Sequence, residues 1–397
     1  MIKKVSSKSK ISVIGLGYIG SSLSLLLSQK FNVTGFDIDS EKAMKLGNQD
    51  FSSVDDPMIE EVARSNNFNF RVSSNLEDVF KSDIIILCLP TDWNEQDKTL
   101  NTDLIEDFVD QIALVNTESL IILKSTLPIG LTSKLKMRYP DLSICYSPEF
   151  LQEGRSIIDN LYPSRIIVGG DNQAAMEVTA GLMASFSLHE NNNILFMSSS
   201  EAEATKLFSN MYLSMRVAFF NELDTFTMHK GLDTKSIIDG VCADNRIGNF
   251  YNNPSFGFGG YCLPKDSFQL EASFTGIPQS LISGTIQANH SRKLEIIRQV
   301  KDRGVNNVGI YCLENKFQSG NYRHSVMIDL IDMLVDEGID VLIYEESLHE
   351  ETFKNSIVIK DFLQFKKDSE LILTNRFQPL LSDVTDKVFT RDIFNRN

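Results

Sequence analysis

The stretch ISVIGLGYIG, residues 11–20, constrains the fold of this chain more than any other. Residues 11–14 form the short apolar run of a buried strand, and Leu23, Leu26 and Leu27 follow the glycines at helical spacing. A second apolar run, FNVTGFDID, begins at Phe31. Strand, glycine turn, helix and strand in this order predict the βαβ unit of a doubly wound α/β fold.

The glycines of GLGYIG have the spacing of a dinucleotide site. Gly15 permits the tight turn, Gly17 lets the backbone approach a pyrophosphate, and Gly20 lets the helix pack against the strand. The helix N-terminus, with Tyr18 and Ile19, is expected to supply amide donors to the phosphates. A purely structural glycine turn is the alternative.

An acid at the end of the second strand indicates which dinucleotide binds. Asp37 follows Gly20 by 17 residues and suits a ribose 2′-hydroxyl, whereas it would repel a 2′-phosphate. NAD is therefore favoured over NADP. The nearby Asp39 is interpreted instead as the cap of the helix SEKAMKLG.

Three further apolar runs extend this first domain. IIILCLP (84–90) and LIILKST (120–126) end in polar residues, which is typical of parallel strands buried on both faces. Their carboxyl ends are expected to open on one crevice, where such sheets bind ligands. Together with RIIVGG (165–170), they predict an N-terminal NAD-binding Rossmann domain over residues 1–198.

A single long helix is predicted from Ser198 onward. Ser199 or Ser200 is expected to cap it and Gly231 to end it, after about 30 residues. This length suggests a link between domains, so residues 199–295 are interpreted as a central helical and dimerisation region. Its apolar residues recur at steps of three or four and offer a face to a dimer partner; they are Leu207, Met211, Met215, Phe219, Leu223 and Phe226.

Strand and helix patterns alternate again over residues 296–397. NNVGIYCL (306–313) precedes a helical pattern from Met327 to Val335, and DVLIYE (340–345) and ELILTN (370–375) follow. The predicted fold class is α/β, with two Rossmann-like doubly wound domains joined by a long central helix.

Composition excludes several classes of protein. The 397 residues carry a formal charge of −15, whereas a general nucleic-acid binder needs a basic face. No apolar run of about 18 residues predicts a membrane span. Five scattered cysteines without a CxxC pair favour a reducing, cytoplasmic location. The five histidines lack ligand spacing, so no metal site is expected.

Four segments occur together and make a family resemblance specific. They are LPTDW (89–93), KSTLPIG (124–130), SPEFLQEG (147–154) and FGFGGYCLPKD (256–266). With the helix of residues 201–224 and the loops DNRIG and YNNPSFG, they make the chain similar to the UDP-glucose/GDP-mannose dehydrogenases, a family of nucleotide-sugar 6-dehydrogenases. The resemblance runs from about residue 11 into the C-terminal domain.

The resemblance implies a four-electron oxidation, most closely that of UDP-glucose to UDP-glucuronate with two NAD and one water. Cys262 corresponds to the family's nucleophile, which forms a thiohemiacetal and then a thioester. The neighbouring Lys265 would favour its thiolate. Cys88, Cys145 and Cys312 lie in strand-like runs and are interpreted as packing, and Cys242 matches no family role.

Family roles carry over to further residues. Lys206 and Asn210, four apart on the long helix, would hold the reacting alcohol and a water, with Lys206 stabilising the oxyanion. Asp266 would act with them as acid/base. The remaining roles follow by position. Glu149 would position the hydrolytic water, and Glu153 would lie near the nicotinamide. The implied catalytic residues are Cys262, Lys206, Asn210, Asp266, Glu149, Glu153 and Thr126. The implied cofactor contacts beyond the glycine turn and Asp37 are Lys42, Thr91, Thr126, Glu153, Lys265 and Arg323.

The substrate and the oligomer follow from the same resemblance. Arg246 resembles an arginine that reaches the substrate of a neighbouring subunit, which implies a homodimer. The substrate contacts are expected from Glu149, Phe150, Leu151, Glu153, Lys206, Asn210, Arg246, Tyr251, Phe256, Gly259 and Lys316, with the diphosphate held by a local group of cations.

Three alternatives remain open from the sequence. The first is a sibling enzyme acting on GDP-mannose or a UDP-N-acetylhexosamine. The second is a two-electron 3-hydroxyacid dehydrogenase, in which Cys262 would be incidental. The third is a dinucleotide-dependent sensor without turnover. The number of NADH released for each nucleotide sugar distinguishes them.

Overall fold

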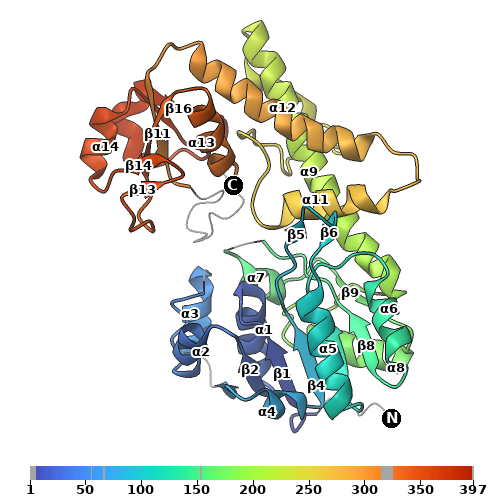
Figure 1. The fold of residues 1–397 in the computed structure, drawn as a ribbon. Coiled ribbons are helices and arrows are strands. Elements are labelled where there is room, and N and C mark those ends of the chain that lie inside the picture. The colour runs from blue at the N-terminus through green and yellow to red at the C-terminus, as the bar shows by residue number, and fades with distance from the viewer. Residues whose placement is uncertain (1–5, 55, 66–67, 153, 314–324, 396–397) are drawn as a thin grey trace. The chain divides into compact units, whose positions relative to one another are not determined.

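The computed structural model describes residues 6–54, 56–65, 68–152, 154–313 and 325–395 of the chain. The chain divides into two compact units, Met1–Phe208 (unit 1) and Ser209–Asn397 (unit 2). Each unit has its own sheet and its own hydrophobic core (Figure 1). In the described part of the chain, no helix is long and apolar enough to cross a membrane.

Unit 1 is built on an eight-stranded sheet in the order β10-β9-β8-β7-β4-β1-β2-β3. Six neighbouring strands are parallel, whereas β9 pairs antiparallel to β8 and parallel to β10. The strands are β1 (Lys10–Ile14), β2 (Asn32–Phe36), β3 (Phe70–Val72), β4 (Ile84–Leu87), β7 (Leu120–Leu123), β8 (Ser143–Tyr146), β9 (Ile166–Gly169) and β10 (Ile194–Met197). A separate hairpin joins β5 (Trp93–Asn94) and β6 (Thr99–Leu100).

Helices cover both faces of this sheet, because its central strands are apolar on both sides. One face packs against α1, α3, α7 and α8, and the other against α4, α5 and α6 (Figure 1). The helices are α1 (Tyr18–Ser28), α2 (Ser40–Gly47), α3 (Pro57–Ser65), α4 (Leu76–Phe80), α5 (Asp103–Val115), α6 (Leu131–Arg138), α7 (Ser156–Leu161) and α8 (Gln173–Ala184).

Unit 2 contains a six-stranded sheet in the order β13-β14-β12-β11-β15-β16. All neighbours are parallel except the hairpin β13–β14. Its strands are β11 (Asn307–Tyr311), β12 (Asp340–Tyr344), β13 (Thr352–Phe353), β14 (Ser356–Val358), β15 (Leu371–Leu373) and β16 (Val388–Phe389). Its further elements are α10 (Thr234–Cys242), α11 (Cys262–Ser273), α12 (Leu281–Lys301), α13 (Val326–Asp336), α14 (Phe362–Asp368) and the 3₁₀ segment η1 (Pro379–Lys387).

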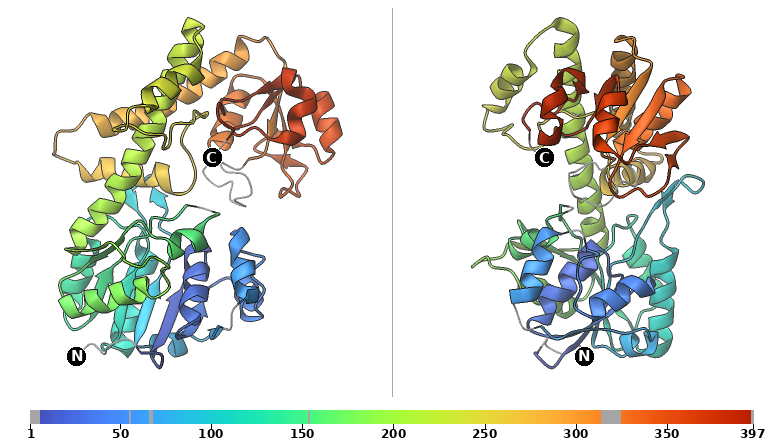
Figure 2. Two further views of the ribbon diagram at one scale, coloured as in Figure 1. Left: turned by 180° about the vertical axis from the view of Figure 1, so that it is seen from behind. Right: turned by 90° about the vertical axis from the view of Figure 1, so that its left-hand side faces the viewer.

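Helix α9 (Ser199–Lys230) is one continuous helix of 32 residues that begins in unit 1 and continues in unit 2 (Figure 2). Gly231 follows it with a φ of +64°, a conformation that glycine adopts without strain, so the predicted end is confirmed. The predicted N-cap, Ser199 or Ser200, is wrong by one or two residues. Ser198 caps the helix, because its Oγ accepts from the Glu201 N–H while the Glu201 carboxylate accepts from the Ser198 N–H at 2.8 Å.

The predicted fold class is confirmed, and the predicted apolar runs form β1, β2, β4, β7, β9, β11, β12 and β15. The division into three sequence regions stays a prediction. The first turns of α9 belong to unit 1, while the expected central and C-terminal regions share unit 2. The antiparallel β9 was not predicted, because a buried apolar strand carries no sequence signal for its direction.

A buried ion network in unit 2 ties three distant segments together. Asp224 of α9 accepts from Arg292 Nη2 of α12 at 2.5 Å and from Arg391 Nε near the C-terminus at 2.9 Å. Burial raises the pKa of the Asp224 carboxyl, but the two guanidinium groups outweigh burial and hold it below its ordinary value. Asp224 is therefore an ionised group whose loss leaves buried positive charge.

We expect Asp224→Ala to destabilise unit 2 by about 3–5 kcal/mol, because Arg292 stays buried without its carboxylate. Urea unfolding followed by circular dichroism measures the loss. Asp239→Ala is the matched control, since Asp239 makes an exposed pair with Lys235, worth about 0.3–0.5 kcal/mol. Equal midpoints for the two variants would contradict the assignment.

Candidate active site

The glycine turn of unit 1 has the geometry of a phosphate cradle. Gly15 lies at φ +88°, and a Cβ there would meet the Cys88 carbonyl oxygen at 2.4 Å. A Cβ on Gly20 would meet the Gly15 carbonyl oxygen at 1.9 Å, so helix and turn approach closely. Gly17 caps α1, and apart from its chain neighbours no heavy atom of the described residues lies within 4 Å of its Cβ position. The turn thus leaves room where a pyrophosphate would approach the N-terminus that carries Tyr18 and Ile19.

Asp37 and Asp39 have the different positions that the sequence suggests. Asp37 follows β2, and its carboxylate accepts from the Leu16 N–H of the glycine turn at 2.7 Å. It therefore lies beside the cradle. Asp39 accepts from the N–H groups of Glu41 and Lys42, both at 3.1 Å, and caps α2 as predicted. Lys42 is thus in the first turn of α2.

Two threonines meet where β4 and β7 end. Thr91 and Thr126 are both buried, and the Thr91 hydroxyl donates to the Thr126 carbonyl oxygen at 2.9 Å. Their neighbour Ser125 donates to the Leu89 carbonyl oxygen at 2.6 Å. These bonds fix the two strand ends side by side, at the edge of the sheet where doubly wound folds bind ligands.

A buried ion pair joins the SPEFLQEG segment to α9. Lys206 Nζ donates to Glu149 Oε1 at 2.7 Å and to the Glu149 carbonyl oxygen at 2.8 Å. Burial raises the pKa of the Glu149 carboxyl, but the Lys206 charge and hydrogen bond outweigh burial and lower it overall. Glu149 is therefore held ionised next to a cation, an arrangement suited to orienting a water or stabilising an oxyanion.

The residues that follow Glu149 are partly engaged within unit 1. The Leu151 N–H donates to Glu149 Oε2 at 2.7 Å, and the Arg165 guanidinium lies 3.8 Å from the centre of the Phe150 ring. Lys206 Nζ lies 5.5 Å from the same ring. The backbone N–H of Leu151 thus already has an acceptor, which the predicted substrate contact did not include.

Cys262 is the first residue of α11, and three of the residues predicted to act with it, Asn210, Lys265 and Asp266, form a buried group in unit 2. Asp266 accepts from Asn210 Nδ2 at 2.5 Å and from Lys265 Nζ at 3.0 Å. All three of these side chains are buried. Asp266 is therefore fixed between an amide and an ammonium, one turn along the helix that Cys262 opens, and can exchange protons with a bound group.

The other cysteines differ from Cys262 in their surroundings. Burial raises the pKa of the Cys88 thiol to about 12 and that of the Cys145 thiol to about 11. Both remain protonated near neutral pH, and a thiol is a poor nucleophile. Cys242 is buried in α10. Cys262 is partly accessible, as Cys88 and Cys312 are, but it differs from all four other cysteines in that it opens a helix.

The predicted substrate loop of unit 2 is braced from several sides. The N–H of Phe256 donates to Asn375 Oδ1 at 3.2 Å, and its ring is fully buried 5.6 Å from the Phe389 ring. Phe256 thus supports the loop from the core. Tyr251, at φ +50°, is exposed, and Gly259 is half-buried. Arg246 is exposed over 89% of its side chain and pairs with Asp244.

Three predicted site residues, Glu153, Lys316 and Arg323, lie outside the described residues. Within the described ranges, no cluster of three His, Cys, Asp or Glu side chains could hold a metal ion.

Sequence reasoning missed Glu203. Its buried carboxylate accepts from the N–H groups of Gly130 and Thr132 at 2.5 and 2.9 Å, so it caps α6 from one turn before Lys206. Glu203 thereby fixes the end of the KSTLPIG segment against α9. Its position in EAEATK, three residues before Lys206, was the available signal.

Comparisons with known proteins agree with this geometry. The model for the NAD binding domain of the UDP-glucose/GDP-mannose dehydrogenase family matches residues 9–187, and the model for its central domain matches residues 200–291. The prediction of NAD as the cofactor is thereby confirmed.

Related sequences extend along the whole chain. A UDP-glucose 6-dehydrogenase of Campylobacter jejuni is 40% identical over 391 residues, which cover 97% of this chain and 99% of that protein. A UDP-glucose 6-dehydrogenase of Streptococcus pneumoniae is 39% identical over 394 residues, or 98% and 100% of the two chains. A GDP-mannose 6-dehydrogenase of Pseudomonas syringae is 25% identical, over 94% and 89%.

The fold is that of a solved UDP-glucose dehydrogenase from Pyrobaculum islandicum, with a TM-score of 0.87 at 20% identity over 100% of this chain and 97% of that one. From the two family models and the relatives at about 40% identity, the chain belongs to the UDP-glucose/GDP-mannose dehydrogenase family.

Proposed function

We propose that the protein oxidises UDP-glucose to UDP-glucuronate, using two NAD and one water. The observation that carries the proposal is a buried group in which Asn210 of α9 meets Asp266 and Lys265, both of which lie on the helix that Cys262 opens. A nucleophile next to a fixed acid/base group is what thioester chemistry requires. The choice of UDP-glucose is supported by the two relatives at about 40% identity, both named UDP-glucose 6-dehydrogenases.

The first half of the reaction oxidises the C6 alcohol to an aldehyde. NAD, when bound, accepts one hydride from this alcohol and a second NAD accepts one from the cysteine adduct formed later. Lys206 stabilises the developing alkoxide, since it is already held as a cation by Glu149 at 2.7 Å. Asp266 takes part in moving the hydroxyl proton, with Asn210 and Lys265 fixing its orientation.

The second half of the reaction runs through Cys262. Its sulfur attacks the aldehyde carbon and forms a thiohemiacetal, which retains the intermediate on the enzyme. Loss of hydride from this adduct gives a thioester. Glu149 orients the water that attacks the thioester carbonyl, so that the carbon–sulfur bond breaks and the Cys262 thiolate and the product carboxylate are released.

A panel of nucleotide sugars tests the substrate. We expect two NADH for each UDP-glucose consumed, measured at 340 nm with limiting sugar, and little turnover of GDP-mannose or UDP-N-acetylhexosamines. Turnover of GDP-mannose without UDP-glucose would assign the protein to a sibling activity. Release of one NADH for each molecule of a 3-hydroxyacid would support the two-electron alternative. No turnover of any substrate would support the sensor.

Replacing the nucleophile tests the covalent route. Cys262→Ser is expected to lower steady-state NADH release from UDP-glucose by roughly 10³-fold or more, because the weaker nucleophile does not form the adduct. Cys145→Ser is the matched control and should retain activity, since the Cys145 thiol is buried and protonated. Near-normal release by Cys262→Ser would refute the thioester.

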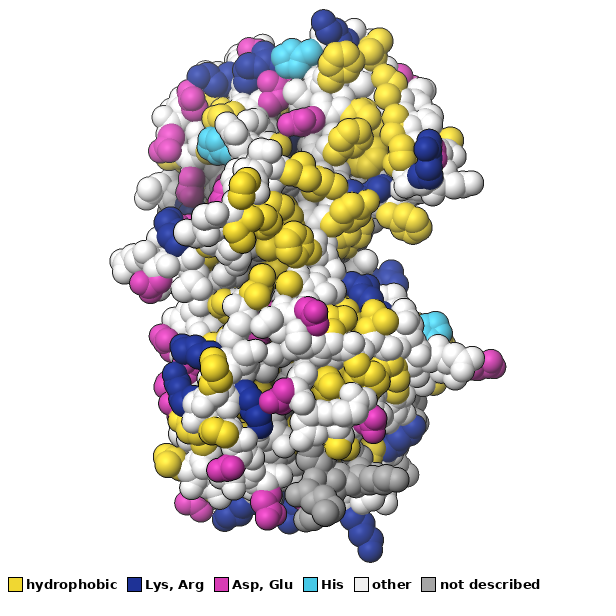
Figure 3. Space-filling model, turned by 90° about the vertical axis from the view of Figure 1, so that its right-hand side faces the viewer, with side chains coloured by type: hydrophobic (Ala, Val, Ile, Leu, Met, Phe, Trp, Pro, Cys, Tyr) yellow, Lys and Arg dark blue, Asp and Glu magenta, His cyan; other side chains and the backbone are white. Residues whose placement is uncertain are grey.

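We also propose a homodimer formed through α9. Four aromatic residues recur along it at steps of four and seven, and each is about half exposed; they are Phe208, Tyr212, Phe219 and Phe226. This heptad-like stripe is the pattern of helix-to-helix packing. Hydrophobic side chains gather on one face of unit 2 in Figure 3. The exposed Arg246 suits a role toward the partner's substrate.

Light scattering after gel filtration tests the dimer. The wild-type protein is expected to have a mass of twice the 44.7 kDa of one chain. The double variant Phe219→Glu, Phe226→Glu is expected to have the mass of one chain, because charge on the stripe opposes its burial. Leu363→Glu, on the exposed side of α14, is the control and should leave the mass unchanged. A monomeric wild type would exclude this interface.

We place the enzyme in the cytoplasm, where nucleotide sugars and NAD are available. All five cysteines are free thiols, which supports a reducing compartment.

A further inference from the structure

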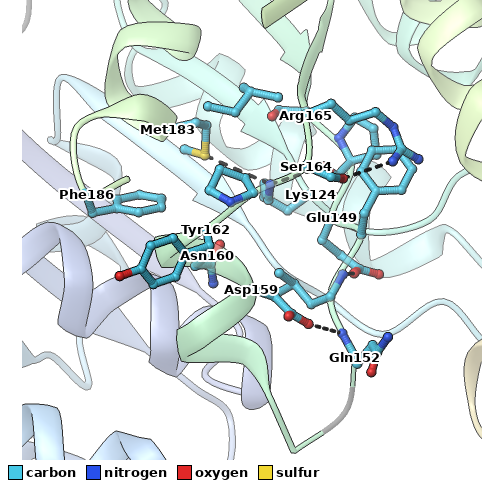
Figure 4. Close-up of a pocket in the computed structure, with 16 residues that line it drawn as sticks. Lys124, Glu149, Gln152, Asp159, Asn160, Tyr162, Ser164, Arg165, Met183 and Phe186 are labelled. Atoms are coloured by element: carbon cyan, nitrogen blue, oxygen red, sulfur yellow. Dashed lines mark hydrogen bonds between the residues drawn. The ribbon is translucent and has the colours of Figure 1, made fainter. Parts of the chain in front are cut away.

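A cavity of about 250 Å³ in unit 1 shares Glu149, Phe150 and Leu151 with the candidate active site, but the proposed reaction gives its other walls no role. It is lined by the loop of residues 147–152, by α7, by residues 162–166 and by the end of α8 (Figure 4). One water takes up about 30 Å³ of liquid, so the cavity has room for a small organic molecule.

Lys124 is a buried cation at this cavity. Only 7% of the residue is exposed, and it follows the last residue of β7. Its ammonium makes two long contacts, to the Pro148 carbonyl oxygen at 3.4 Å and to Met183 Sδ at 3.9 Å. An ammonium has three N–H donors, so at least one has no acceptor among the described residues. A buried charge in this state is costly unless a ligand or water satisfies it.

A second donor faces the same space. Asn160 of α7 lines the cavity, and its buried Nδ2 has no hydrogen-bond partner among the described residues. Lys124 and Asn160 therefore both offer N–H groups, and the acceptor that would complete them is absent from the described protein atoms.

The carboxylates that line the cavity are already paired. Glu149 accepts from Lys206 at 2.7 Å and from the Leu151 N–H. Asp159 accepts from the Gln152 N–H at 2.8 Å and lies 3.8 Å from Arg155 Nε. Lys124 therefore feels the charge of Glu149 but has no hydrogen bond to a carboxylate of the described cavity wall.

The cavity walls away from these donors are apolar. Met183 of α8 and Phe186, which follows the end of this helix, are both buried, and both line the cavity (Figure 4). A ligand that fits both parts has a single negative group and an apolar body. A dianion suits the cavity less well, because Glu149 and Asp159 would repel the second charge.

We propose that this cavity binds a small monocarboxylate, with its carboxylate on Lys124 and Asn160 and its apolar body against Met183 and Phe186. The site is built by unit 1 alone and does not depend on the proposed function. Its ligand approaches Glu149, so binding is expected to alter the field at that residue.

Binding should weaken at alkaline pH. Burial lowers the pKa of Lys124 to about 8, while Cys88 and Glu149 oppose this and Lys206 adds to it. Glu149 stays ionised and Cys88 stays protonated up to about 12, so Lys124 is the group that titrates. The other titratable groups that line the cavity are Asp159, Tyr162 and Arg165. Affinity should fall about tenfold for each pH unit above 8.

Calorimetric titration of the full chain with acetate, butyrate and benzoate at pH 7 tests the site. Sodium chloride matches the ionic strength, and saturating NAD and UDP occupy other anion sites. We expect saturable binding that strengthens about threefold to fourfold with each added methylene. Binding that is equal for acetate and butyrate would argue against the apolar walls, and no binding of any acid would refute the site.

Three variants locate the binding. Lys124→Met and Asn160→Asp should each weaken benzoate at least tenfold, and the second preserves side-chain size if the first impairs folding. Lys134→Met, which removes an exposed lysine of α6, should bind as wild type does. Unchanged binding by both cavity variants overturns the proposal.

A crystal soaked with 4-bromobenzoate tests the position directly, whatever the variants do. We expect the bromine anomalous peak inside the cavity, near Met183 and Phe186. A peak found only elsewhere overturns the proposal, as does binding at crystal concentration only.

Discussion

The buried polar side chains of α9 are the constraint on which the rest of the structure depends. A charge or amide withdrawn from water must find a partner, and such groups recur along this helix. Glu203 caps α6, Lys206 holds Glu149, Asn210 holds Asp266, and Asp224 binds Arg292 and Arg391. Each pairing fixes one segment of a unit to α9. Within each unit, these pairings to α9 therefore fix the positions of the reactive groups.

These pairings explain how a chain with a formal charge of −15 can handle an anionic nucleotide sugar. The excess of acids describes the solvated exterior. Near the candidate site the cations are buried, at Lys124, Lys206 and Lys265, where low dielectric strengthens their effect. Composition therefore excludes a general nucleic-acid binder but says little about the charge inside one pocket.

The fold was predictable where apolar residues recur at regular spacing or where glycine marks a turn. The glycine turn, the runs that form β4 and β7, and α9 itself all carry local signals, because apolar spacing and φ preference act over a few residues. The N-cap of α9 was misplaced among three consecutive serines, since only the partner Glu201 selects Ser198. The direction of β9 depends on packing within the sheet, which no local pattern records.

The candidate site was predictable through motifs, and less so through contacts. Motif position predicted Asn210, Lys265 and Asp266 as residues of one site, and their side chains lie together in unit 2, while their roles stay a prediction. It gave no sign that the Leu151 N–H is already engaged or that Phe256 lies in the core. Such facts depend on long-range partners, for example Asn375, which is 119 positions from Phe256.

The partners of α9 also set an order of assembly during synthesis. Glu203 accepts from residues 130 and 132, and Lys206 donates to residue 149, so the partners of both are made before them. Asp224 instead pairs with Arg292 and Arg391, both of which are made after it. Because domains fold as units, N-terminal first, on the ribosome, unit 1 can close while unit 2 is still being translated. The second half of α9 is thus made with a carboxylate whose two cationic partners follow only 68 and 167 residues later in translation.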